Sequence, residues 1–69
     1  MRLSTRNQLS GTVTSIVTGE AMAVVKLQLD DGPEITSSIT REAVEDLELS
    51  PGKAVVVLVK STEVALAVD

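Results

Sequence analysis

The chain has 69 residues, a formal net charge of −4, and no aromatic residue, cysteine or histidine. A domain of this length buries roughly 60% of the surface that its unfolded chain exposes, so a monomer is only marginally stable. Disulfides, a structural metal or self-association stabilise such small domains, and without Cys and His the first is excluded and the second is disfavoured. We therefore expect a single domain over residues 1–69 that forms homo-oligomers.

The same composition argues against several functions. Phosphate backbones bind clustered Lys and Arg, and single strands stack on aromatic rings, so we expect no nucleic-acid binding. Without His or Cys an enzyme would need a carboxylate or Lys as its base, and no paired-carboxylate motif is present, so we expect no catalysis. The first eleven residues lack the apolar run of a signal peptide, and no stretch has the ~20 apolar residues that span a bilayer. A cytoplasmic location without membrane contact is the expectation.

The first half of the chain has the periodicity of β-strands. β-Branched residues dominate residues 11–17, and apolar and polar residues alternate over residues 22–29 and 34–40. Turn residues separate these segments, first around Gly19 and then at the Asp-Asp-Gly-Pro sequence that follows Leu29. Three consecutive strands are predicted.

The second half begins with a change of period. Ala43, Val44 and Leu47 recur at helical spacing, and Thr40 is the expected N-cap of this short helix. Two further strands are predicted over residues 54–59 and 63–68. The fold class is therefore all-β, and the element order is that of a five-stranded OB-type barrel with its helix between strands 3 and 4.

The fourth predicted strand is apolar on both faces. Val55, Val57 and Val59 alternate with Val56 and Leu58, and successive side chains of a strand point to opposite faces. A barrel has only one interior, so a second subunit is expected to cover the outer face. The alternative is that the chain's own helix or N-terminal arm covers it.

Hydrogen-bond donors are abundant near the ends of the predicted strands. The chain has seven serines and seven threonines, and donors and cations cluster in the Ser-Thr-Arg-Asn sequence from Ser4 and the Lys-Ser-Thr sequence from Lys60. A tetrahedral oxyanion needs converging donors and positive charge, and the helix N-terminus at Thr40 also exposes free N–H groups. If these segments meet, they form an oxyanion pocket. Alternatively, Arg6 and Lys60 form surface ion pairs, the polar residues beside Arg6 are turn residues, and Thr40 is a cap alone.

The sequence resembles the molbindins, small proteins that consist of a single molybdate-binding Mop domain. The resemblance covers nearly the whole chain and depends on the start "LSTRNQLSGTV", on Ile39 and Thr40 before the helix, and on the end "VVLVKST" followed by Val64. It implies an OB-type barrel that assembles as a hexamer, a trimer of dimers, with molybdate or tungstate bound between subunits. Such a site holds the anion by hydrogen bonds and charge and needs no direct coordination of the metal and no cofactor.

Carried over residue by residue, the resemblance implies an oxyanion site at Ser4, Thr5, Arg6, Asn7, Thr40, Lys60 and Ser61. It also implies a second oxyanion site in the turn at Gly19, Glu20 and Ala21. There are two departures from the family pattern. Ala43 replaces a hydroxyl residue that is common in the helix, and Met22 replaces an Asn that is common after the turn.

The function expected from these features is storage or buffering of molybdate by a stand-alone domain. One alternative is a general oxyanion protein for sulfate or phosphate, since sulfate is also a tetrahedral dianion. Another is a purely structural assembly module in which Arg6 and Lys60 pair with carboxylates and no ligand is needed.

Overall fold

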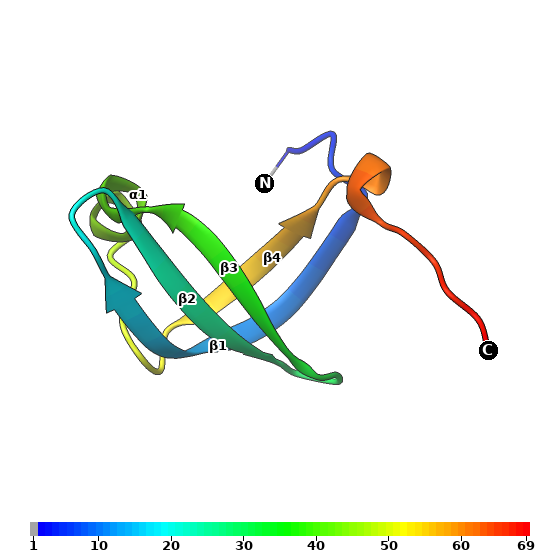
Figure 1. Cartoon of the computed structure of the whole chain (residues 1–69), viewed down its shortest axis with the longest axis horizontal. Helices are drawn as coiled ribbons and strands as arrows, with labels where there is room; N and C mark the ends of the chain where they lie inside the picture. Colours follow the sequence, from blue (N-terminus) through cyan, green and yellow to red (C-terminus); the bar gives the residue numbers. More distant parts are fainter. Residues whose placement is uncertain (1) are drawn as a thin grey trace.

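The computed structural model describes residues 2–69, and their fold is mostly β. The elements in chain order are β1 (Asn7–Thr18), β2 (Met22–Leu29), β3 (Glu34–Thr40), α1 (Arg41–Asp46), β4 (Ala54–Val59) and a short 3₁₀ helix, η1 (Ser61–Glu63). The strands form one curled sheet in the order β3-β2-β1-β4, and all neighbouring strands are antiparallel (Figure 1). No helix among residues 2–69 is long and apolar enough to cross a membrane.

The long strand β1 pairs with two partners and so connects the two halves of the sheet. Its residues from Asn7 to Thr12 pair with β4, and those from Gly11 to Thr18 pair with β2. Gly11 lies in both ladders, and a Cβ atom there would stand 2.8 Å from the carbonyl oxygen of Gln28. A side chain at this position would therefore collide with the backbone of β2.

The helix α1 confirms the local prediction at Thr40. The Thr40 hydroxyl accepts a hydrogen bond from the Ala43 N–H at 3.0 Å, as an N-cap does. The helix buries Val44 against the sheet. After the helix, the Lys53 ammonium group donates to the carbonyl oxygens of Leu47 and Glu48, at 2.9 and 3.2 Å, and this ties the following loop to the helix end.

The core is small and consists of apolar side chains of the sheet and of α1. The buried side chains come from β1, β2 and α1: Val13, Ala23, Val25, Leu27 and Val44. Half-buried residues of β3 and β4 pack against this core, among them Ile39 and Val57. So few buried residues agree with the marginal stability that the chain length predicts.

The fifth strand predicted over residues 63–68 is not formed in this chain. Residues 61–63 are the 3₁₀ helix, and residues 64–69 are irregular and run away from the sheet (Figure 1). Leu66 and Val68 are 92% and 97% exposed. A strand needs a neighbour for its backbone groups, and the described part of the chain provides none for this segment.

The outer face of β4 is also uncovered. Val56 and Leu58 are 42% and 45% exposed. The alternative that the helix or the N-terminal arm covers this face is therefore wrong for the chain by itself.

Candidate functional site

One end of the sheet brings two donor-rich segments together. The β1–β4 ladder ends at the pair Asn7 and Val59, so the residues before β1 and after β4 lie side by side. They line a shallow pocket of about 230 Å³. The residues that line it are Ser4, Thr5, Arg6, Lys60, Ser61 and Thr62. We call this set the cation pocket.

The charge of the cation pocket is uncompensated within the described chain. Arg6 and Lys60 are both exposed. The one ion pair among residues 2–69 joins Arg41 to Glu45, at 3.4 Å. The alternative that Arg6 and Lys60 form surface ion pairs is therefore wrong for the described residues of this chain. The cation pocket carries their two positive charges beside several hydroxyl groups.

Two side-chain amides hold the backbone around the cation pocket. The Asn7 amide group donates to the carbonyl oxygen of Val59 at 3.1 Å, and this bond joins segments 52 residues apart. The Gln8 amide group donates to the carbonyl oxygen of Thr5 at 3.0 Å. The two segments that carry the cations are thus fixed to the ends of β1 and β4.

Thr40 lies in a different part of the molecule. It lines a hollow together with Ala21, Arg41 and three acidic residues, which are Glu20, Glu42 and Glu45. The residues of the predicted second site lie at this end too: Gly19 N–H donates to Met22 at 2.7 Å, and Arg41 N–H donates to the Ala21 carbonyl at 2.9 Å. The name acidic hollow refers below to the six residues that line it: Glu20, Ala21, Thr40, Arg41, Glu42 and Glu45.

The segments before β1 and after β4, which line the cation pocket, lie at the opposite end of the curled sheet from α1 and the β1–β2 turn, which line the acidic hollow (Figure 1). The twelve residues of β1 begin beside the cation pocket and end beside the acidic hollow. The chain therefore brings together Ser4, Thr5, Arg6, Lys60 and Ser61, with Asn7 behind them, but it does not bring Thr40 to them. One chain by itself cannot bind an anion with both groups.

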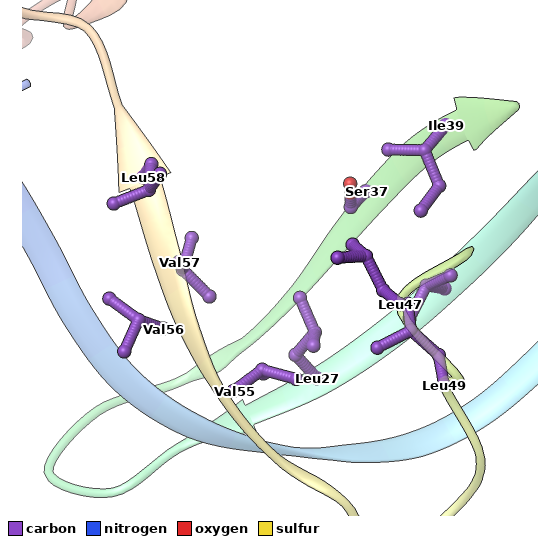
Figure 2. Close-up of a pocket in the computed structure, with 10 residues that line it drawn as sticks. Leu27, Ser37, Ile39, Leu47, Leu49, Val55, Val56, Val57 and Leu58 are labelled. Carbon is purple, nitrogen blue, oxygen red and sulfur yellow. The ribbon is translucent and has the colours of Figure 1, made fainter. Parts of the chain in front are cut away.

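Thr62 lines the cation pocket beside Lys60, as its place in the donor-rich Lys-Ser-Thr sequence indicates, although the site residues that the resemblance implies do not include it. Sequence reasoning missed an apolar groove of about 230 Å³ between β3 and β4. Figure 2 shows Val55 and Val57 of β4 on one side of it and Ile39 with Leu47 on the other. No group of three or more residues with metal-ligating side chains occurs among residues 2–69.

A comparison with protein families identifies a domain that this chain matches. The TOBE domain model matches residues 3–66, which is nearly the whole chain. That range includes both segments of the cation pocket and all of the acidic hollow.

Similar proteins share a reference to molybdenum in their names. A probable molybdenum-pterin-binding protein of Haemophilus influenzae is 36% identical over 69 residues, which is all of both chains. The structure of a molybdate-binding protein from Sporomusa ovata superposes with a TM-score of 0.91 and 42% identity, over 97% of this chain and 98% of that one. The cytoplasmic molybdate-binding protein ModG, with molybdate bound, superposes with a TM-score of 0.93 and 48% identity, over 100% of this chain and 49% of that one.

The chain also matches part of longer proteins. It spans 26% of the molybdenum transport protein ModE of Azotobacter vinelandii, at 42% identity over 69 residues. The molybdate-binding proteins are thus similar to this chain in sequence as well as in fold.

Proposed function

Because this chain belongs to the TOBE domain family, we propose that it binds molybdate, stores or buffers it in the cytoplasm, and does no catalysis. The observation that carries the proposal is the cation pocket, where Arg6 and Lys60 lie together without a carboxylate partner in the described chain. Relatives of matching length are named for binding molybdenum-pterin or molybdate. The longer protein ModG, of which this chain spans about half, is described as cytoplasmic and has molybdate bound.

Hydrogen bonds and charge are the proposed means of recognition. A molybdate dianion presents four oxygens and two negative charges, which Arg6 and Lys60 balance. The hydroxyl groups of Ser4 and Ser61 and the backbone near Thr5 provide directed donors. Tungstate has the same charge and shape, so the same pocket accepts it.

We propose that Thr40 reaches the anion from a second copy of the chain. Thr40 belongs to the acidic hollow at the opposite end of the sheet from the cation pocket, so a site that uses both requires two subunits. The Thr40 hydroxyl accepts from Ala43 N–H and keeps its own proton free to donate to an anion. A homo-oligomer of single-domain chains, a hexamer as in the family that the sequence resembles, provides such contacts.

The fifth strand of the barrel is proposed to come from a second copy too. Residues 64–68 are apolar and exposed and form no strand in this chain. The groove between β3 and β4 is also apolar and lies between the two unpaired edges of the sheet. Filling the groove with this segment pairs both edges and covers Leu47, which is 60% exposed (Figure 2). Burial of each large apolar side chain contributes about 1.5–3 kcal/mol.

The second oxyanion site proposed at Gly19, Glu20 and Ala21 has fewer free donors than the cation pocket. The Gly19 N–H is already bonded to Met22, and the Glu20 carboxylate lies in the acidic hollow. Anion binding there depends on the backbone N–H groups of Glu20 and Ala21 and on a position of the Glu20 side chain away from the anion.

Calorimetric titration with molybdate, repeated in excess sulfate, tests the function. We expect saturable binding that survives sulfate, together with a mass near 43 kDa by light scattering, six times the 7.2 kDa of one chain. Binding that sulfate abolishes would instead support the general oxyanion function. An oligomer that binds no anion would support the structural assembly function.

A further inference from the structure

Asn7 lies behind the cation pocket and not in its lining. Its side chain is half-buried and its amide donates to the Val59 carbonyl at 3.1 Å. Ser4, Thr5 and Arg6 on one side and Lys60, Ser61 and Thr62 on the other form the lining. Asn7 therefore bonds to the backbone immediately before Lys60 while its own backbone directly follows Arg6.

The position of this bond at the end of the ladder gives it a specific task. Asn7 and Val59 are the last paired residues of β1 and β4, and beyond them the chains that carry Arg6 and Lys60 have no strand pairing. Two cations on neighbouring unpaired segments repel each other. A cross-strand side-chain bond at this point opposes that separation before the anion arrives.

We propose that Asn7 is a positioning residue, whose amide holds the Lys60 segment against the Arg6 segment and so preorganises the pocket for an oxyanion. This inference rests on the proposed function and assigns Asn7 a part distinct from direct contact with the anion. This raises the affinity for the anion, because the two segments lose less conformational entropy when the anion binds.

A double-mutant cycle between Asn7 and Lys60 distinguishes positioning from contact. Asn7→Ala is expected to weaken molybdate binding about five- to tenfold, the effect of one neutral hydrogen bond. In a Lys60→Ala background the same change is expected to have little further effect, because the segment that Asn7 positions has lost its cation. Losses that simply add would mean that Asn7 acts on the anion directly, and unchanged affinity in Asn7→Ala would remove it from the site. Either result overturns the proposal.

Hydrogen exchange of the anion-free protein provides a readout that does not need binding. The Glu63 N–H donates to the Lys60 carbonyl at 2.9 Å, so its exchange reports how firmly the turn after β4 is held. We expect faster exchange of this amide in Asn7→Ala than in the wild type. Unchanged exchange would overturn the positioning role even if the wild type bound no molybdate, and a wild type that does not bind would by itself contradict only the proposed function.

Two further variants act as controls. Gln28 makes the same kind of bond far from the pocket, from its amide to the Gly32 carbonyl at 2.7 Å, so Gln28→Ala is expected to leave the affinity and the Glu63 exchange unchanged. Asn7→Leu keeps the side-chain volume without a donor, and it replaces Asn7→Ala if alanine unfolds the protein. Equal effects of Gln28→Ala and Asn7→Ala would show a general loss of stability and contradict the proposal.

Discussion

The cation pocket and the acidic hollow differ in charge although both contain residues of one predicted site. The cation pocket carries Arg6 and Lys60 and no carboxylate, whereas the acidic hollow carries three glutamates and Arg41, which pairs with Glu45. A free anion is attracted to the first and repelled by the second. Thr40 can therefore contribute to anion binding when the cation pocket of another chain meets it, but not within the hollow alone.

This difference also explains why a small acidic protein can bind an anion. The net charge of −4 says nothing about where charge is placed. Seven of the ten acidic residues lie between Asp30 and Glu48, far along the chain from both cations of the pocket. Local charge at the pocket, and not the total, decides which ligand approaches.

The largest effect is expected from breaking the contact between copies. Leu66→Asp places a charge on the exposed apolar segment that we propose fills the groove of a second copy. The oligomer should dissociate and molybdate binding should be lost with it, since Thr40 and the cation pocket no longer meet. Light scattering and calorimetry measure the two losses.

Ala67→Asp is the control for the Leu66 variant. In an extended segment neighbouring side chains point to opposite faces, so this charge lies on the face away from the groove. We expect this variant to remain an oligomer and to bind. A Leu66→Asp protein that keeps both its oligomeric mass and its affinity would contradict the proposal that this segment fills the groove of a second copy.

Much of the sheet could be predicted from the sequence, and the fifth strand could not. Alternation of apolar and polar residues predicts β2 and β3 with the bounds that the structure has, and Thr40 is the predicted helix cap. The start of β1 at Asn7 was missed because its first four residues are mostly polar. Residues 63–68 have a strand pattern, but a pattern does not say whether the partner edge belongs to the same chain.

The candidate site was predictable in composition and not in arrangement. The donor-rich sequences at Arg6 and Lys60 stand out, and the antiparallel β1–β4 pairing brings them together. Spacing along the chain does not reveal that Arg6 and Lys60 lie beside one end of β1 and Thr40 lies near the other end. It also does not reveal that the Asn7 side chain is engaged with the Val59 backbone.

Substitution of Thr40 is expected to have the next largest effect. Asp caps helices as well as Thr does, so Thr40→Asp should change the free energy of unfolding by less than about 0.5 kcal/mol. It nevertheless replaces a donor by a negative charge, which should weaken molybdate binding at least about a hundredfold. Calorimetry and thermal unfolding measure the two quantities.

Thr40→Ser and Thr40→Ala complete that test. Serine keeps both the cap and the donor and should behave like the wild type. Alanine loses the cap, at a cost of about 0.5–2 kcal/mol in stability, in addition to the donor. Full affinity in Thr40→Asp would show that Thr40 is a helix cap alone and that the site is complete at the cation pocket.

The smallest of the three effects concerns the cation pocket itself. Lys60→Ala removes one charged donor and should weaken molybdate binding by about 1.5–3 kcal/mol, or roughly 10- to 150-fold, without unfolding an exposed position. Lys26→Ala is the matched control, since Lys26 is exposed in the middle of β2 and its loss changes the net charge equally. If the two variants lose affinity equally, the net charge of the protein governs anion binding. The difference in charge between the cation pocket and the acidic hollow then has no effect on it. A loss confined to Lys60→Ala would instead locate the attraction at the pocket, where an acidic chain has kept two cations free of its own carboxylates.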